Sequence, residues 1–296
     1  MQREYLLRFL DGFAFPDGAK EALTSAYEKV KGSVFFKYIS AYEDGSLSYD
    51  EGIKKVVTLA QEISVNEYTL VLLYLIYLAE VLKKRYVMQG MDTEVWRSSM
   101  LDLKSKAIDC EGYCGIWGTK VAPWHKGFFE LQRFGFEKLQ FNISSFGKKY
   151  DKNGLHLTED DIVLRVHIPR TGEKLDYEGV QKAYRQATVF FKKHFPKQFK
   201  DRPVVFVLQS WMLFDKLKTV LNPQSNFMKF CNDYDVFEQE MYEDYSSTWR
   251  VFYRPYEGDL SKMPQDTSLQ RAYAKWIEQG EKVGAGWGLY YPNFID

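Results

Sequence analysis

Residues 160–208, DDIVLRVHIPRTGEKLDYEGVQKAYRQATVFFKKHFPKQFKDRPVVFVL, contain the pattern that decides the fold. They predict a strand over Asp161–Ile168, a helix over Tyr177–Phe195 and a second strand over Val204–Leu208. Because a crossover helix of this length returns the chain in its original direction, the two strands are expected to lie parallel in one sheet. The second strand is apolar without alternation, so both of its faces are expected to be covered.

The turn after the first strand is a candidate anion site. Its strand places His167 on the less apolar face, and Pro169 then ends the ladder. Gly172 permits an unusual turn, and Asp176 can cap the helix that follows. Backbone amides at a helix start bind anions, so this turn could hold a negatively charged ligand.

Beyond the second strand, Gln209, Ser210 and Trp211 emerge at its carboxyl end, where open α/β sheets bind their ligands. The later segments predict, in order, a short helix, two strands, a last helix and a terminal strand or loop rich in glycine. These are Asp215–Leu221, Phe227–Asp233, Thr248–Arg254, the helix that begins at the capping-box pair Thr267 and Gln270, and VGAGWG with its glycines at 284, 286 and 288.

Upstream, the first 118 residues or so repeat an apolar period near 3.6, which predicts a helical bundle. Ser48 with Glu51 and Ser64 with Glu67 have capping-box spacing. The helix Asn66–Arg85 is apolar nearly all round and is expected at the centre. Its expected neighbours are Arg3–Phe13, Ala19–Val30, Val34–Tyr42 and Tyr49–Ile63.

Near residue 120 the period changes from helical to alternating. Lys120–His125 contains Pro123 and turn residues, and Phe128–Phe134 is expected to form a hairpin across Gly135 with the strand around Phe141. We therefore predict an α+β protein with a helical N-terminal domain over residues 1–119 and a mixed-sheet domain flanked by helices over residues 120–296.

Composition excludes several classes of function. Lys plus Arg and Asp plus Glu both number 40, so the zero formal charge argues against a nucleic-acid or membrane-surface partner. The apolar run Leu70–Ala79 is about half of the roughly 20 residues that span a bilayer. Three cysteines form no disulfide framework, and the first residues lack a signal-peptide pattern, so a cytoplasmic location is expected. Cys110 and Cys114 lack further ligands at metal spacing, so no metal is expected.

Four segments together resemble a known family. HIPRTGEKLDYEGVQKAYRQATVFFKKHFP, LQSWMLFDKL, NPQSNFMKF and PQDTSLQRAYAKWIEQG are similar to segments of acyltransferase-domain proteins that pair a helical N-terminal domain with a GNAT-like C-terminal domain. FFELQRFGFEKLQFNI resembles a further strand of that family, from which Gln132 and Phe134 depart. The resemblance covers about residues 120 to 290 strongly and the helical part weakly.

The resemblance implies a GNAT-type fold, in which an acyl-CoA lies where two parallel strands splay apart and its acyl group passes to an amine. The usual pyrophosphate signature of GNAT enzymes is missing. Arg170, Thr171 and Gly172 are all that the corresponding turn offers for the cofactor, and Arg271 could reach a phosphate or carboxylate. A surface ion pair is the alternative for Arg271.

Acyl transfer needs a proton acceptor for the amine and a proton donor for the leaving thiolate. His167 is the candidate acceptor because imidazole titrates near neutrality, and the alternative is a histidine bonded within the sheet layer. Ser210 and Asn226 could orient the amine or the thiolate, and the alternative for both is a capping or turn role.

Two hypotheses follow. The first is an N-acyltransferase that uses acetyl-CoA or another acyl-CoA and a small-molecule amine acceptor. The second is a catalytically inactive GNAT-like module that binds a small ligand or a protein partner. The acceptor, the acyl length and the oligomeric state do not follow from the sequence.

Overall fold

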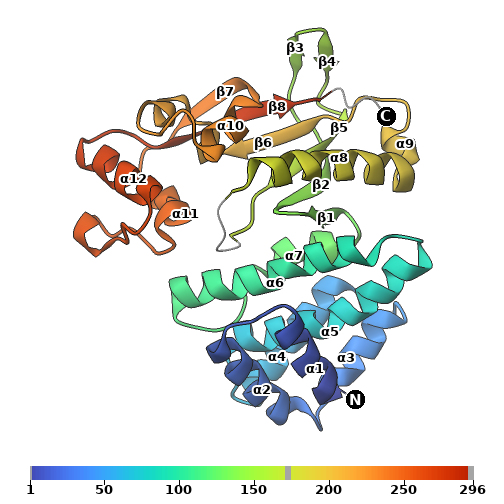
Figure 1. The fold of residues 1–296 in the computed structure, drawn as a ribbon. Coiled ribbons are helices and arrows are strands. Elements are labelled where there is room, and N and C mark those ends of the chain that lie inside the picture. Colours follow the sequence, from blue (N-terminus) through green and yellow to red (C-terminus); the bar gives the residue numbers. More distant parts are fainter. Residues whose placement is uncertain (1, 171–174, 293–296) are drawn as a thin grey trace. The chain divides into compact units, whose positions relative to one another are not determined.

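The computed structural model describes residues 2–170 and 175–292. The chain has two compact units (Figure 1): the described residues within Met1–Gly135 and Pro169–Thr171 form the first, and those within Phe136–Ile168 and Gly172–Asp296 form the second. The predicted α+β class is confirmed, because a run of helices precedes a mixed sheet flanked by helices.

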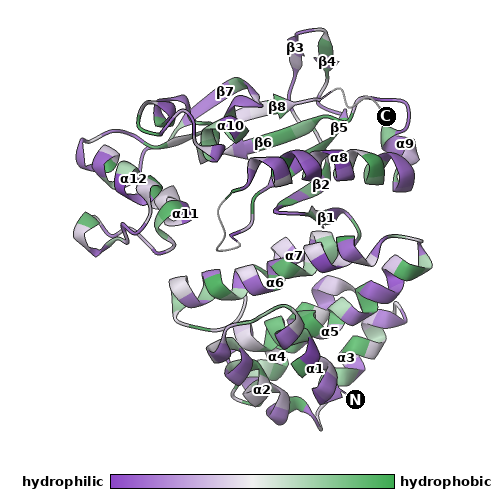
Figure 2. Cartoon of the chain, in the orientation of Figure 1, coloured by the Kyte–Doolittle hydropathy of each residue, from purple (hydrophilic) through white to green (hydrophobic). Residues whose placement is uncertain are grey.

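The first unit is a helical bundle around α5 (Glu67–Met88). Helices α2, α3, α4 and α6 all pack against α5, and every residue from Leu70 to Ala79 is buried. Figure 2 shows the resulting apolar stretch in the middle of this helix. No helix among the described residues combines the length and the hydropathy needed to cross a bilayer. The other helices are α1 (Gln2–Gly12), α2 (Asp17–Val30), α3 (Phe35–Glu43), α4 (Tyr49–Glu62), α6 (Thr93–Cys114) and α7 (Ala122–Phe129).

One of the two predicted caps in this unit is wrong. Ser48 and Glu51 form the expected capping box at the start of α4. At α5, however, Oδ1 of Asn66 accepts from the amides of Tyr68 and Thr69. Ser64 instead lies in the preceding turn with a φ of 52°, too far back to reach the first helical amides.

The segment predicted as a turn over Lys120–His125 is the start of α7. Pro123 lies in its first turn, where the missing amide hydrogen costs nothing. The strand β1 therefore begins only at Arg133 and ends at Phe136. Gly135 lies inside this strand, and a Cβ there would stand 2.7 Å from the backbone of Ser98, so the close approach of α6 requires glycine.

The second unit is built on the sheet strands β2-β5-β6-β8-β7, in this spatial order. Strands β5 and β6 run parallel and are joined through α8, which confirms the predicted βαβ unit. The bounds are β2 (Leu139–Ser145), β5 (Ile162–His167), β6 (Phe206–Ser210), β7 (Asp235–Met241), β8 (Gly284–Tyr290) and α8 (Tyr177–His194), with a separate hairpin of β3 (Tyr150–Lys152) and β4 (Leu155–Leu157).

The two faces of this sheet have different covers. On one face Tyr184 of α8 contacts Phe206 with ring centroids 4.7 Å apart. The side chains of α8 that share this face are fully buried: Val180, Ala183, Ala187 and Phe191. On the other face Val163 and Val207 pack with Phe146 and with Tyr150 and Leu157 of the hairpin. Asp176 caps α8 as predicted, since its carboxylate accepts from the amide of Gly179.

Two predicted strands in this unit are wrong. Phe227–Asp233 is largely the helix α10 (Asn226–Asn232), and the strand follows it as β7. Thr248–Arg254 is the end of one 3-10 turn (Ser246–Thr248) and the helix α11 (Trp249–Phe252). Short apolar runs fit a helix or a strand equally well, so burial within the folded unit decided both.

The remaining elements of this unit agree better with those predicted from the sequence. Thr267 and Gln270 form the predicted capping box of α12 (Ser268–Glu278), and the glycine-rich tail is the strand β8. The short helix expected from Asp215 is a 3-10 helix. The other short elements are α9 (Pro196–Phe199) and the 3-10 helices η1 (Trp211–Leu213), η2 (Asp215–Thr219) and η4 (Leu260–Lys262).

Candidate functional site

The parallel strands of the second unit separate toward their carboxyl ends. Their ladder consists of the pairs Leu164 with Phe206 and Arg165 with Val207. Beyond these pairs, β5 continues beside β2 and β6 continues beside β8. We call this feature the β5/β6 divergence, and it comprises Val166 and His167 on one side and Leu208, Gln209 and Ser210 on the other. The two facing strand edges form no ladder with each other there.

His167 is the last residue of β5 and lies at the divergence. It pairs with Gln140 in the β2/β5 ladder, and its side chain is half-buried. It shares a strand face with Arg165, because side chains two residues apart point to the same side.

Ser210 and Asn226 both make hydrogen bonds to the backbone. The Oγ of Ser210 accepts from the amide of Met212 at 3.2 Å and caps η1. Asn226 donates through Nδ2 to the carbonyl of Leu175 at 3.1 Å, which ties the start of α10 to the segment that enters α8. The sequence offered two alternatives for these residues, a role in orienting the amine or the thiolate and a role in capping or turn formation. The observed hydrogen bonds are of the second kind.

Two of the four residues predicted for the cofactor, Arg170 and Arg271, contact other groups of the protein. Arg170 lies 3.7 Å from a carboxylate oxygen of Asp109, within the first unit. Thr171 and Gly172 fall outside the described residues. Arg271 donates through Nη1 to the carbonyls of Gln265 and Asp266, so its guanidinium holds the loop before its own helix.

A polar network that the sequence did not predict connects α8, β8 and the residue after α10. Asp233, just after α10, accepts hydrogen bonds from the hydroxyl of Tyr177 and from Nε2 of Gln181, both at 2.7 Å. Tyr290 of β8 in turn donates to Oε1 of Gln181. Burial raises the pKa of the Asp233 carboxyl, while the bonds from Tyr177 and Gln181 oppose that shift. The network fixes the first turns of α8 against α10 and β8.

The first unit holds an arrangement that resembles a catalytic triad. Thr119 Oγ1 lies 3.0 Å from Nε2 of His125, and Nδ1 of His125 lies 3.4 Å from Oδ2 of Asp102. All three side chains are at most 1% exposed, so no substrate can reach them. Burial lowers the pKa of His125 to about 4, with Asp102 opposing the shift. The group is therefore a structural polar cluster around a neutral histidine.

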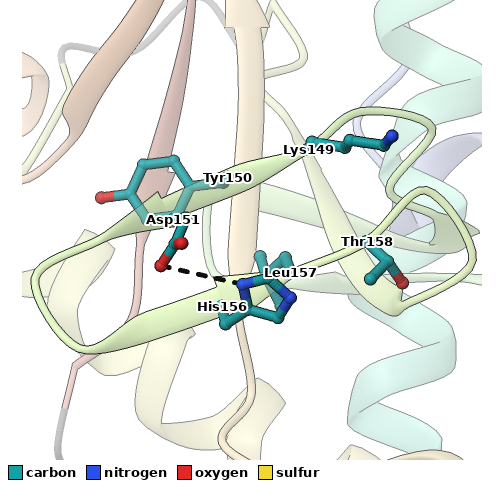
Figure 3. A pocket seen from close by; sticks show the side chains of 6 residues that line it. All are labelled: Lys149, Tyr150, Asp151, His156, Leu157 and Thr158. Carbon is teal, nitrogen blue, oxygen red and sulfur yellow. Dashed lines mark ion pairs between the residues drawn. The ribbon is translucent and has the colours of Figure 1, made fainter.

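A surface pocket lies on the β3/β4 hairpin (Figure 3). Its volume is about 590 Å³, and its lining comes from the hairpin and the residues next to it. His156 and Asp151 face each other across the strands, with Nδ1 and Oδ1 3.7 Å apart. Both side chains are largely exposed, so the pocket lacks the buried polar groups that a binding site uses to orient a ligand.

Within residues 2–170 and 175–292, no three His, Cys, Asp or Glu side chains are grouped so that they could hold a metal ion. Cys110 and Cys114 lie at the end of α6, which closes on Gly115 with a φ of 68°.

Comparison with known proteins points to one family and one fold. The model of the GNAT-like C-terminal domain matches residues 131–290. No curated protein matches the chain. A mutant acyltransferase crystallised with octanoyl-CoA is 17% identical, with a TM-score of 0.71 over 97% of this chain and 88% of that chain. An acyltransferase crystallised with decanoyl-CoA and teicoplanin is 18% identical, with a TM-score of 0.70 over 95% of this chain and 86% of that chain. At these identities the likeness is one of fold.

Proposed function

Since this chain belongs to the GNAT-like C-terminal domain family, we propose that it is an acyl-CoA-dependent N-acyltransferase. One observation carries the proposal: β5 and β6 pair through Arg165 and Val207 and form no ladder with each other beyond that point. Two parallel strands that separate in this way leave backbone groups on both facing edges. An extended thioester can pair with those groups, and their amides can stabilise the oxyanion of the reaction.

In the proposed reaction a neutral amine attacks the thioester carbonyl carbon. A carbon–nitrogen bond forms, the carbon–sulfur bond breaks, and CoA leaves as its thiolate. The nitrogen loses one proton and the thiolate gains one, so no further reactant is consumed. We assign the proton acceptor role to His167, which lies at the divergence, and a role in orienting the amine or the thiolate to Ser210 and Asn226.

The solved structures with this fold support an acyl-CoA as co-substrate, because they contain octanoyl-CoA or decanoyl-CoA. We propose that its phosphates lie near the first backbone amides of α8. Teicoplanin in one related structure supports a small-molecule amine as acceptor. The free thiols of Cys110, Cys114 and Cys231 are compatible with the reducing cytoplasm, where we place the reaction.

One observation favours a second candidate, a catalytically inactive module that binds a small ligand or a protein partner. The carboxylate of Asp176 lies at the start of α8 and accepts a hydrogen bond from the amide of Gly179. A negative charge at that position repels a pyrophosphate, and the usual phosphate-binding signature is missing from the turn. Such changes are expected when CoA binding is no longer maintained.

Thermal shift titration separates the two candidates. Acetyl-CoA, octanoyl-CoA and decanoyl-CoA are titrated separately, and a ligand at 100 times its dissociation constant stabilises the fold by about 2.7 kcal/mol. A shift with at least one acyl-CoA, followed by thiol release in the presence of an amine panel, is the expected result. If none of the three raises the melting temperature, the acyltransferase proposal is wrong.

A further inference from the structure

The guanidinium of Arg165 is a half-buried cation for which the described part of the chain provides no acidic partner. It lies on β5, where Nε donates to Oγ of Ser144 at 3.2 Å and Nη2 donates to the carbonyl of Phe146 at 3.4 Å. Among the described residues, no carboxylate lies within ion-pair distance of Arg165, and its burial lowers the pKa of the guanidinium. A guanidinium has five N–H donors, so an open edge remains after these two bonds.

An unpaired charge of this kind costs stability. Removing a cation from water is expensive unless an anion or several hydrogen bonds compensate for the lost hydration. Ser144 and the carbonyl of Phe146 are neutral, so their hydrogen bonds compensate only in part for the hydration that the guanidinium loses. The neighbouring cation, Lys148, differs in this respect because both carboxylate oxygens of Glu238 lie 2.7 Å from its Nζ.

An aromatic ring adjoins this charge. The ring of Trp287 on β8 has its centroid 5.1 Å from Cζ of Arg165 and 4.7 Å from Nζ of Lys148. The ring is partly exposed, so it offers an apolar surface between two cations. A ligand with a carbon skeleton and an anionic end could therefore pack its carbons on the ring and bind the cation with its anionic end.

The position relates this site to the β5/β6 divergence. Arg165 pairs with Val207 in the last parallel pair, and Trp287 pairs with Gln209 beyond it. Val207 packs with the hairpin on one face of the sheet, whereas the adjacent Phe206 contacts α8 on the other. Arg165 therefore lies on the face opposite α8, away from the helix start at which we place the phosphates of CoA.

We propose that Arg165 binds the carboxylate of the acceptor, so that the acceptor is an amino acid or another small amine that carries a carboxylate. This inference rests on the proposed acyltransferase function and specifies its second substrate. The guanidinium fork receives the carboxylate, Trp287 covers the connecting carbons, and the amine extends toward the divergence, where His167 lies on the same strand face.

Binding of acylated products tests the proposal without requiring turnover. The ligands are the N-octanoyl derivatives of glycine, β-alanine and γ-aminobutyrate, each compared with its primary amide by calorimetry. Since these ligands contain no free amine, differences in amine basicity do not affect the comparison. We expect at least one acid to bind tenfold or more tightly than its amide, which a charged hydrogen bond provides, and we expect added salt to reduce the difference.

Substitutions then locate the site. Arg165→Met is expected to remove the preference for acid over amide, and Arg165→Lys to keep part of it, because lysine retains the charge but not the fork. Arg202→Met is the matched control, since Arg202 is an exposed arginine that pairs with Asp161. Octanoyl-CoA binding is measured on each variant and is expected to stay unchanged.

Three outcomes would overturn the inference. One is a wild-type protein that binds all three amides as well as the acids, a result that needs no variant to fold. Another is a preference that survives in Arg165→Met. The third is a loss of octanoyl-CoA affinity in Arg165→Met, which would assign the anion to a CoA phosphate. A wild-type protein that does not bind octanoyl-CoA at all would instead contradict the proposed function.

Discussion

His125 Nδ1 lies 3.4 Å from Oδ2 of Asp102, and both side chains are buried. Burial lowers the pKa of His125 from 6.5 to about 4, so the folded chain binds fewer protons than the unfolded chain between these two values. Stability is therefore fully retained above pH 6.5 and falls as the pH is lowered toward 4. The shift corresponds to roughly 3 kcal/mol of unfolding free energy.

Urea unfolding of wild type and His125→Gln at pH 7.5, 6, 5 and 4.5 checks this expectation. The difference between the two free energies should shrink as the pH falls, because the glutamine does not titrate. His156→Gln is the control, since His156 is 72% exposed in its side chain. Parallel pH profiles for wild type and His125→Gln would contradict the assigned pKa.

Asp233 accepts from two side chains, so its two substitutions should differ. In Asp233→Ala, the hydroxyl of Tyr177 and the amide of Gln181 both lose their acceptor, with an expected cost of about 1–3 kcal/mol. Asp233→Asn keeps an oxygen for one of them and avoids the burial of a charge, so it should cost less. Asp215→Ala, which removes one exposed ion pair, should cost under about 1 kcal/mol. Equal destabilisation by the alanine and asparagine substitutions of Asp233 would argue against the network.

Gly286 of β8 leaves no room for a side chain. A Cβ at this position would lie 2.5 Å from the carbonyl oxygen of Leu213, so Gly286→Ala must displace η1 or the strand. Overpacking of this kind costs about 1–3 kcal/mol. Because Gly286 pairs with Ser210, the change should also weaken any stabilisation by octanoyl-CoA. Gly12→Ala is the control, since no atom lies within 4 Å of its added Cβ. The thermal shift and urea midpoints of both variants measure these effects.

His167→Gln should slow acyl transfer while leaving octanoyl-CoA binding unchanged. Loss of a general base lowers the rate by roughly 10²- to 10⁴-fold. Thiol release with an amine acceptor gives the rate, and calorimetry gives the affinity. His156→Gln, on the exposed hairpin, should retain the wild-type rate. A His167→Gln variant with unaltered rate would remove His167 from the proposed mechanism.

Much of the fold could be predicted because local rules specify it. The βαβ unit, the caps at Ser48, Asp176 and Thr267 and the central helix α5 follow from periodicity and from hydrogen bonds between residues a few positions apart. The predicted strand at Phe227 was wrong because local rules do not specify the structure of that segment. Its apolar residues fit a helix or a strand, and packing against distant residues decided in favour of a helix.

The candidate site was predictable only in outline. The position of His167 at a strand end and the parallel direction of β5 and β6 follow from the sequence itself, as does the capping capacity of Ser210. Nothing in the sequence around Arg165 shows that no carboxylate among the described residues pairs with its side chain, since this depends on every element packed nearby.

Local sequence patterns specified the helices α4, α5, α8 and α12 and the parallel strand pair at the centre of the second unit. Where that pair separates, which ring adjoins Arg165, and the bond between Asp233 and Tyr177, 56 residues apart, became visible only in the folded chain. Helix starts depend on hydrogen bonds within one turn of chain. Contacts between distant side chains depend on how whole elements pack, because packing alone brings them within reach.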